Sequence, residues 1–163
     1  MTNTYLSFVV CDELFAVNVS KVLEVLQMQH ITHVPNAPNY IRGIINFRGD
    51  VVPVFESRVK FTLPSRNEES AFVIIVLDLS KENEVFRIGA IVDRVKDVIS
   101  IEESEIKPVP AMSKDFNTDF LQGIFKLRND FIMLLNVEKI FSGSELQGLK
   151  EVNRIEEQVI NNH

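Results

Sequence analysis

Short apolar runs separated by polar turns make up most of this chain. Valine, isoleucine, phenylalanine and leucine dominate the runs, and the breaks carry polar pairs such as Asp-Glu, Arg-Gly and Glu-Asn. Runs of this length, rich in β-branched and aromatic residues and bounded by turn residues, predict strands. The expected strands are Tyr5–Cys11, Leu14–Val19, Ile41–Phe47, Val51–Phe55, Ala71–Leu79, Val85–Val92, Val95–Ile99, Leu121–Leu127 and Phe131–Val137. This pattern favours a mainly all-β fold, built as barrels or a sandwich.

Helical patterns are confined to two places. In Ser20–Leu26, three apolar residues recur at helical spacing, which predicts a turn or two of helix. Near the carboxyl end, Ser144 and Gln147 have the spacing of a capping box, and an apolar stripe follows. The stripe consists of Leu146, Leu149, Val152, Ile155 and Val159. We therefore expect residues 144–163 to form an amphipathic C-terminal helix and tail.

The two halves of the chain, on either side of the polar loop Pro64–Ser70, resemble each other. Gly43–Val54 aligns with Gly123–Leu134 at an offset of 80 residues, with Gly, Ile, Arg and Asp at matching positions. Shorter segments align at offsets of 71 and 73, namely Glu13–Val17 with Glu84–Ile88 and Lys21–Val25 with Arg94–Val98. Because these features recur in the same order, the sequence indicates a duplicated unit of about five strands.

A duplicated unit of roughly 70 residues has only a marginal core, so the two copies should pack against each other. We expect one domain over residues 1–143, with subdomain 1 at about 15–80 and subdomain 2 at about 1–14 plus 81–143. The copies are expected to share the first strand. A seam between two packed copies is a place where a binding groove forms.

The segment from residue 40 to residue 61 predicts a β-hairpin whose polar tip raises a question of role. Gly49 suits the bend, because glycine takes a positive φ without strain. We interpret Asn46 as satisfying turn backbone groups, and Arg48 as mainly structural, because the duplicate keeps an arginine there, Arg128. The alternative, in which Arg48 contacts a partner, stays open. The candidate residues of this hairpin, structural or partner-binding, are Gly43, Asn46, Arg48 and Gly49.

Composition and charge narrow the class of protein. Of 163 residues, 45% are hydrophobic and 25% are charged, as in globular domains. The formal net charge is −6 and the basic residues are scattered, which disfavours nucleic acid and anionic membrane surfaces as partners. The amino terminus lacks signal-peptide features, and the longest apolar run, Ala71–Leu77, is too short to span a bilayer. The single Cys11 excludes an internal disulfide and is expected to be a buried thiol, so the sequence predicts a cytoplasmic protein.

The sequence has no recognisable catalytic, metal or cofactor pattern. His30 and His33 lie three residues apart, but no third metal ligand stands out. Glu102, Glu103 and Glu105 belong to a polar turn, where we expect solvated side chains rather than acid–base catalysts. Glycine-rich phosphate loops and the pattern G-x-S-x-G are missing. The sequence therefore favours a binding or scaffold module without a cofactor; the alternative is a small-ligand-binding or catalytic barrel without recognisable motifs.

The hairpin sequence YIRGIINFRGDVVPVFESRVKF resembles the signature region of the CheW family of bacterial chemotaxis coupling proteins. The usual pattern there is close to F-I-x-G-V-I-N-L-R-G-x-V-V-P-V-x-D-L-R. Four further pieces are similar to the family in the same order, namely FVVCDELFAVNVSKVLEVLQM, HVPNAPNYIRG, RIGAIVDRVKDVISI and LQGIFKLRNDFIMLLNVEKIF. The likeness extends over nearly the whole chain. Glu56 stands where Asp is usual, and Ser57 where Leu is usual.

This resemblance implies a fold of two SH3-like five-stranded barrels packed around a hydrophobic seam. It also implies a non-catalytic adaptor with two partners. One is the CheW-like regulatory domain of a CheA-type histidine kinase, and the other is the cytoplasmic helical tip of methyl-accepting chemoreceptors. Such adaptors work in membrane-associated receptor arrays, and no nucleic acid or direct membrane contact is expected.

The seam is where we expect the receptor, because helices bind in apolar grooves. Val22 and Val25 of one copy match Val95 and Val98 of the other, and some of these valines are expected to line the groove. The alternative is that they are ordinary core residues. A kinase domain of like fold is expected to contact the end of a barrel through apolar patches with a polar rim.

Overall fold

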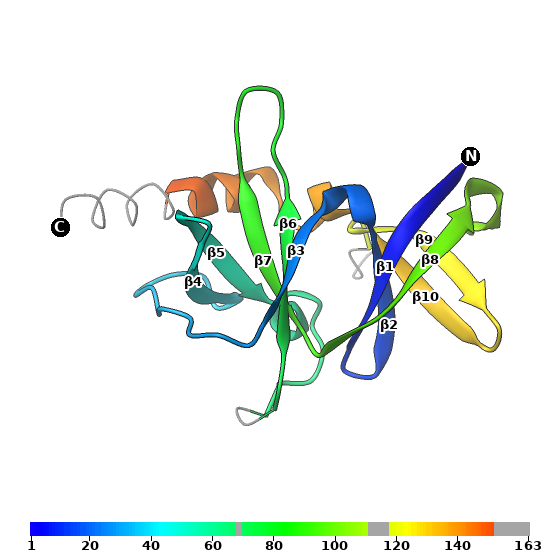
Figure 1. Ribbon diagram of the computed structural model, residues 1–163, viewed down its shortest axis with the longest axis horizontal. Helices are drawn as coiled ribbons and strands as arrows, with labels where there is room; N and C mark the ends of the chain where they lie inside the picture. Colours follow the sequence, from blue (N-terminus) through cyan, green and yellow to red (C-terminus); the bar gives the residue numbers. More distant parts are fainter. Residues whose placement is uncertain (68–69, 111–117, 152–163) are drawn as a thin grey trace.

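The computed structural model describes residues 1–67, 70–110 and 118–151, and these form two five-stranded sheets side by side (Figure 1). The first sheet has the order β8 (Arg94–Glu102), β1 (Thr2–Val10), β2 (Glu13–Asn18), β10 (Asp130–Leu135) and β9 (Leu121–Leu127). The second has the order β3 (Val22–Gln27), β6 (Val73–Asp78), β7 (Arg87–Val92), β5 (Asp50–Glu56) and β4 (Ile41–Phe47). The mainly β class expected from the sequence is confirmed.

Helical elements within residues 1–67, 70–110 and 118–151 are short. They are η1 (Val19–Lys21), α1 (Ser57–Lys60), η2 (Glu103–Glu105), η3 (Val137–Lys139) and a helix over residues 143–151. No helix in the described part of the chain has both the length and the apolar content needed to cross a bilayer.

All nine strands expected from the sequence are present, with ends shifted by no more than three residues. The helix expected at Ser20–Leu26 is wrong. Only η1 is helical there, and the Asn18 side chain starts it by accepting a hydrogen bond from the Ser20 N–H at 2.9 Å. The residues that follow form strand β3, which pairs with β6. In so short a segment the apolar spacing fits either period, and strand pairing decides the outcome.

The duplication is confirmed by the sheet topology. Strands β3, β4, β5, β6 and β7 take the same places in the second sheet as β8, β9, β10, β1 and β2 take in the first. The registers agree as well: Val22 and Val25 pair with Leu77 and Ile75, and Val95 and Val98 pair with Phe8 and Leu6. The first two strands of the chain therefore complete the copy that its C-terminal half begins.

The strand pairings correct one of the sequence alignments. Val54 lies beside Gly89 in the second sheet, and Leu134 lies beside Ala16 at the same place in the first. Strands β7 and β2 are therefore related by an offset of 73 residues. The alignment of Glu13–Val17 at an offset of 71 is wrong by two residues, because two short apolar runs match in more than one register.

The sheets divide the chain after β2 and after β7. Residues 22–92 supply every strand of the second sheet, and residues 2–18 and 94–135 supply the first. The expected limits of 15–80 and 81–143 would instead split β2 and assign β7 to the other sheet. As limits of subdomains that fold as units, they stay a prediction.

In the part of the chain that the structure describes, buried apolar side chains form three clusters. One cluster, which we call the central cluster, draws on both sheets, and the other two each belong to a single sheet. Members of the central cluster include Leu6, Phe8 and Phe15 from the first sheet and Ile75, Leu77 and Ile88 from the second. Neighbouring residues along β6 alternate between the central cluster and the cluster of the second sheet, as the two-residue period of a strand requires. The two sheets are thus held together through the central cluster.

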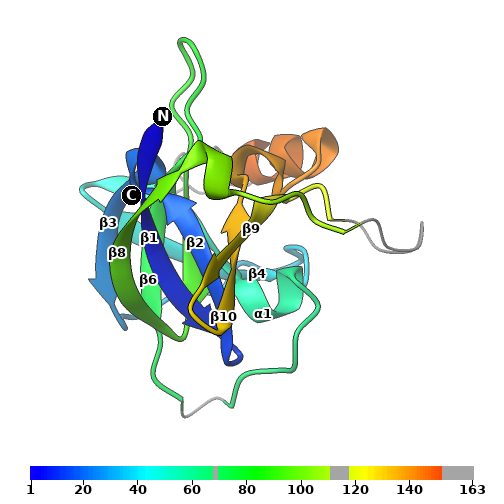
Figure 2. The same ribbon diagram turned by 90° about the vertical axis from the view of Figure 1, so that its right-hand side faces the viewer.

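The helix over residues 143–151 covers one side of the central cluster, where Leu149 is buried. The Ser142 hydroxyl accepts a hydrogen bond from the Glu145 N–H at 3.1 Å, and the Glu145 carboxylate accepts one from the Ser142 N–H at 2.8 Å. The capping box expected at Ser144 and Gln147 is therefore wrong by two residues. Residues Val152, Ile155 and Val159 of the expected stripe lie outside the described residues. Figure 2 shows this helix on the opposite side of the molecule from β3 and β8.

Matching glycines in β4 and β9 lie where another segment crosses the strand. The Thr32 N–H donates to the Ile44 carbonyl at 2.9 Å, and the Ile44 N–H donates to the Thr32 carbonyl at 2.8 Å. A Cβ on Gly43, whose φ is +151°, would lie 2.1 Å from the Thr32 carbonyl oxygen, and one on Gly123 would lie 2.8 Å from the Lys107 carbonyl oxygen. Both positions require glycine because the crossing backbone occupies the space of a side chain.

Cys11 lies in the turn between β1 and β2, not in a buried strand as expected. Its φ is +52°, and its side chain is only partly buried. Its N–H donates to the Asp93 carboxylate at 2.8 Å, which ties this turn to the connection between β7 and β8. The expectation of a buried thiol is wrong because the strand ends one residue earlier, at Val10.

Candidate partner-binding surfaces

The four valines proposed for a groove lie on the two edge strands β3 and β8. Residues directly opposite each other in an antiparallel pair point to the same face of the sheet. The partners of these valines, Leu77, Ile75, Phe8 and Leu6, all belong to the central cluster. All four valines therefore point to the sheet face that carries the central cluster, and β3 and β8 lie on the same side of the molecule (Figure 2).

Burial divides the four valines into two pairs. Val22 and Val95 are partly buried and pack against the central cluster, as the core alternative expects. Val25 is 37% exposed and Val98 is 64% exposed, so these two continue the apolar face into solvent. None of the four valines belongs to the lining of the cavity beside Arg42 and Phe72, which is described below. The same holds for the cavities beside Lys21, beside Phe86 and beside Ser57. The exposed pair forms the outer margin of the seam rather than the wall of a closed pocket.

The tip of the β4–β5 hairpin is held by its own side chains. The Asn46 Oδ1 accepts a hydrogen bond from the Gly49 N–H at 2.9 Å, which is the structural role expected for this amide. Gly49 has the expected positive φ, +87°, and Arg48 has one too, +52°. The Arg48 guanidinium lies 4.7 Å from the centre of the Phe47 ring and 3.8 Å from the Glu24 carboxylate. Arg48 thus links its hairpin to β3.

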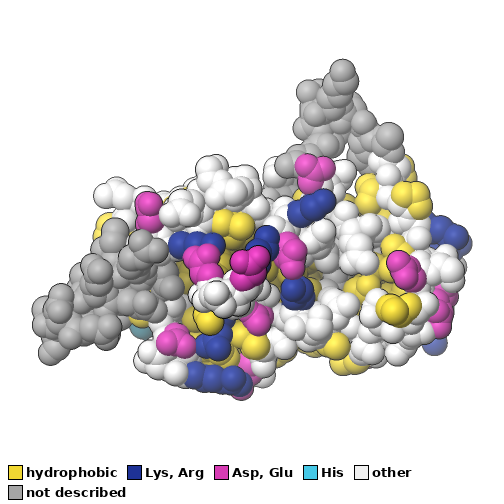
Figure 3. Space-filling model, turned by 90° about the horizontal axis from the view of Figure 1, so that it is seen from above, with side chains coloured by type: hydrophobic (Ala, Val, Ile, Leu, Met, Phe, Trp, Pro, Cys, Tyr) yellow, Lys and Arg dark blue, Asp and Glu magenta, His cyan; other side chains and the backbone are white. Residues whose placement is uncertain are grey.

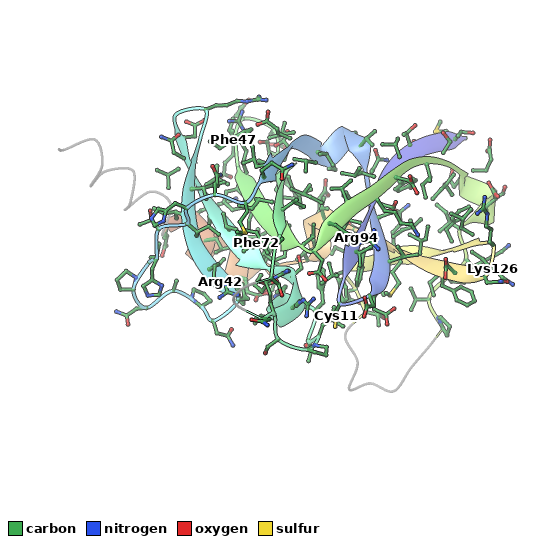
Figure 4. All side chains as sticks on the ribbon, turned by 60° about the horizontal axis from the view of Figure 1, so that its bottom comes forward. Cys11, Arg42, Phe47, Phe72, Arg94 and Lys126 are labelled. Carbon is green, nitrogen blue, oxygen red and sulfur yellow. The ribbon has the colours of Figure 1, made fainter. Side chains whose placement is uncertain are left out.

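The tip of the β9–β10 hairpin has a different surface, which the sequence analysis missed. Phe131 is 61% exposed and Leu127 is 39% exposed, whereas Phe47, which matches Leu127, is 3% exposed. Phe131 faces Lys126 across the strand pair. Figure 4 shows Phe47 in one half of the molecule and Lys126 at the far end of the other. Because opposite residues share a face and successive residues alternate, Phe131 lies on the face of Lys126, and Leu127 lies on the other face with Asp130. The tip therefore exposes one apolar side chain on each face.

Charges on the face shown in Figure 3 are mixed. Dark blue lysine and arginine side chains alternate there with magenta carboxylates, and no large region of one sign is present on this face. Ion pairs of the described residues include Lys60 with Glu145 at 2.8 Å and Lys150 with Glu84 at 3.1 Å. Such a face does not provide the basic stripe that a phosphate backbone requires.

A charged network lies where α1, the loop after it and the β7–β8 connection meet. Glu56 is 2% exposed and accepts hydrogen bonds from Arg66 at 3.0 and 3.2 Å and from Arg42 at 3.2 Å. Asp93 accepts one from Arg58 at 2.7 Å and lies 2.8 Å from the Arg66 guanidinium. Burial by itself raises the pKa of Asp93, but the hydrogen bonds from Arg58 and a backbone N–H, with the charge of Arg66, lower it below its usual value.

Comparison with known proteins gives one consistent result. A family model described as "CheW-like domain" matches residues 4–145. The chemotaxis protein CheW of Klebsiella aerogenes is 30% identical over 142 residues, covering 87% of this chain and 83% of that protein. The chemotaxis protein CheW of Helicobacter pylori is 30% identical over 138 residues, covering 83% of this chain and 79% of that protein. The crystal structure of the scaffolding protein TtCheW from Thermoanaerobacter tengcongensis superposes with a TM-score of 0.77 at 30% identity, covering 89% of this chain and 96% of that chain.

Proposed function

Because this chain belongs to the CheW-like domain family and is a non-catalytic chemotaxis scaffold, we propose that it couples chemoreceptors to a CheA-type histidine kinase. Membership in the family rests on the match over residues 4–145 and on relatives of similar length with the same description. The chain is not an enzyme, because the family acts as an adaptor. Its place of action is the cytoplasm, at membrane-associated receptor arrays.

The receptor contact is proposed at the margin of the seam between β3 and β8. A receptor tip is helical, and a helix that binds to a protein surface uses an apolar stripe. Val25 and Val98 supply exposed apolar groups from two different sheets, and the partly buried Val22 and Val95 come three residues before them on the same strands. A helix lying across both edges would contact the two copies of the duplicated unit at once.

The kinase contact is proposed at the end of the first sheet. The exposed Phe131 supplies an aromatic group there, with Lys126 opposite it on the same face, and Leu127 is exposed on the other face. Apolar cores with polar rims are typical of protein interfaces. The kinase surface is expected to come from its CheW-like regulatory domain, which would present an equivalent sheet end.

The finer description of the fold belongs to the same proposal. We describe each half as an SH3-like barrel, on the basis of its five strands and of the family. In the described residues the sheets are open, since β8 does not pair with β9 and β3 does not pair with β4. Thr32 forms an isolated β-bridge with Ile44 of β4, and Lys107 forms one with Ile124 of β9. These bridges extend the two sheets toward closure.

The single observation that carries this function is the matched placement of Val25 and Val98, exposed on the face that continues the central cluster. We expect Val98→Asp to reduce binding of a receptor-tip fragment by about tenfold or more, because a carboxylate would enter an apolar interface. The fold should remain, since Val98 is mostly exposed. A receptor pull-down beside a circular dichroism melt measures both effects.

Two control variants define what the receptor test means. Val85→Asp places the same charge on another exposed valine, in the loop between β6 and β7, and should bind the receptor like wild type. Val95→Asp buries part of a carboxylate against the central cluster and should lower the melting temperature. A folded Val98→Asp protein that binds the receptor fragment with unchanged affinity contradicts the proposed receptor surface.

A further inference from the structure

A cavity of about 250 Å³ lies beside the charged network, at the edge of the second sheet. Its lining residues are Ile31, Arg42, Glu56, Arg66, Phe72 and Ile91. The three apolar residues belong to or pack against the cluster of the second sheet, so the cavity has an apolar wall and a charged wall. Figure 4 shows Arg42 and Phe72 close together in this half of the molecule. A volume this small suits a ligand group of a few heavy atoms rather than a drug-sized molecule.

Arg66 lines this cavity and has one unsatisfied donor. Its side chain is 5% exposed, and its Nε and Nη2 atoms bind Glu56 and Asp93. Its Nη1 atom is buried and has no hydrogen-bond partner. Buried polar groups are almost always paired, because an unpaired donor loses its hydration without compensation. Nη1 itself is not accessible from the cavity, but the unpaired donor shows that the carboxylates around Arg66 do not use all of its hydrogen-bonding capacity.

The charge of the network also favours one more anion. Among the described residues, three arginines, Arg42, Arg58 and Arg66, share two carboxylates, Glu56 and Asp93. The positive charge that remains lies nearest the cavity, where half-exposed Arg42 makes a single 3.2 Å contact with Glu56. A monoanion in the cavity would balance the network and still leave the existing ion pairs in place.

We propose that this cavity binds a carboxylate group carried on a short aliphatic stem. Arginine guanidinium groups bind carboxylates with matched, bidentate geometry, so the head of the ligand would lie toward Arg42 and Arg66. The stem would contact Ile31, Phe72 and Ile91, and an inorganic anion would leave this wall uncovered. The ligand is therefore an aliphatic carboxylic acid or an acidic side chain of comparable size.

Titration with sodium butyrate, at ionic strength held constant with sodium chloride, tests the site. The methyl resonances of Ile31 and Ile91 in a labelled protein report occupancy of the cavity directly. Butyrate should shift both resonances to saturation, while butyramide, which has the same shape without the charge, should shift neither. Sodium sulfate should leave the two methyl groups unshifted because it has no stem. A blocked tripeptide with a central glutamate separates the two sources: saturation by butyrate alone indicates a free acid, and saturation by the peptide indicates an acidic side chain.

Substitutions locate the binding determinants. Arg42→Gln should weaken butyrate binding by about tenfold, as expected for loss of a charge-assisted contact, while its half-exposed position preserves the fold. Arg128→Gln removes an equally accessible arginine at the far end of the first sheet and should leave butyrate binding unchanged. Phe72→Ala should remove the advantage of butyrate over acetate. Arg66→Gln is a weaker test, because it also removes partners of the buried Glu56.

Three results would overturn the proposal. The first is the lack of saturable methyl shifts with either butyrate or the peptide. The second is an equal response to butyramide or to sulfate, which would indicate apolar filling or a nonspecific anion effect. The third is a folded Arg42→Gln protein that binds butyrate as wild type does.

Discussion

The two hairpin tips of the duplicated unit share a backbone and differ in their surfaces. Both carry an arginine with positive φ, +52° at Arg48 and +58° at Arg128, and both strands before them contain a crossed glycine. Phe47 is nevertheless buried where Leu127 is exposed. Phe47 belongs to the cluster of the second sheet, and Arg87 of β7 lies 5.9 Å from its ring and pairs with Asp50 at 2.9 Å.

The strand that matches β7 in the first sheet is β2, and it has no such arginine. By the 73-residue offset, the position of Arg87 corresponds to Leu14, which packs against the cluster of the first sheet. Within the described residues, Arg128 also makes no ion pair, whereas Arg48 reaches Glu24. Both copies thus share the backbone conformation of the hairpin tip. The tip in the second sheet has its aromatic residue buried, whereas the tip in the first sheet exposes apolar side chains.

The largest expected difference between the tips is in core packing. Phe47→Ala should lower the free energy of unfolding by about 3–5 kcal/mol, because a buried ring is lost from the cluster of the second sheet. Leu127→Ala, at the matching position, should lower it by less than about 1 kcal/mol, since that side chain is already partly exposed. Urea unfolding of both variants measures the gap. Similar losses in the two variants would contradict the contrast in burial.

Substituting the matched glycines should give a smaller difference in unfolding free energy, with the larger loss again in the second sheet. Gly43→Ala should lower the free energy of unfolding by about 2–3 kcal/mol, because φ is +151° and a backbone oxygen blocks the Cβ. Gly123→Ala should cost less, since its nearest contact is the Ile106 side chain at 2.5 Å, although the Lys107 carbonyl lies at 2.8 Å. The measurement is again urea unfolding. Gly148→Ala, in open space on the C-terminal helix, is the control and should be neutral or slightly stabilising.

The exposed tip should matter for binding rather than for stability. Phe131→Ser should weaken binding to the kinase regulatory domain by about 2 kcal/mol, as loss of an aromatic anchor does. The free energy of unfolding should change by less than about 0.5 kcal/mol, because the side chain is mostly exposed. Calorimetric titration and a denaturant melt on the same preparation give both numbers. A large loss of stability with intact binding would assign Phe131 to the fold.

The smallest effect is expected at the two arginines. Arg48→Ala should lower the free energy of unfolding by about 0.5–1 kcal/mol, since its stacking on Phe47 and its pair with Glu24 are both solvent-exposed. Arg128→Ala should leave it unchanged within error. If Arg48 contacts a partner instead, stability should hold while the affinity of one partner drops by about 2 kcal/mol, which parallel melts and titrations with each partner would reveal. Arg48→Lys keeps the charge without the planar group, and so separates stacking from ion pairing.

The strands and the duplication were predictable because they depend on local pattern. Runs such as Ile41–Phe47 and Leu121–Leu127 are found at the expected residues, and the glycine and arginine of each hairpin keep their spacing. Strand β3 was not predictable from spacing, since Val22, Val25 and Leu26 suit a helix equally well. Its pairing with β6 comes from a segment far away in sequence.

Residues whose roles depend on distant partners were missed for the same reason. The burial of Phe47 depends on the cluster of the second sheet, which includes Ile74 and Ile91, and the Asp93 pairs depend on Arg58 and Arg66. These partners are far in sequence from Phe47 and from Asp93, respectively. The exposure of Phe131 likewise depends on which distant segments pack against its hairpin, and the local sequence does not indicate this. The sequence predicted that the four valines proposed for the groove match in pairs between the two copies. Only the structure separates the exposed Val25 and Val98 from the partly buried Val22 and Val95.

The pairing of the first strand with β8 also has a consequence for how the chain folds as it is synthesised. Residues 22–92 are contiguous, so the second sheet has all its strands once β7 has left the ribosome. The β1–β2 hairpin emerges earlier, but β8, β9 and β10 that complete its sheet are made last. Leu6 and Phe8 therefore lack their β8 partners, Val98 and Val95, until β8 is made, in a pairing with high sequence separation that forms slowly. Nascent chains stopped before β8 should accordingly be the ones most prone to aggregate and to engage a chaperone.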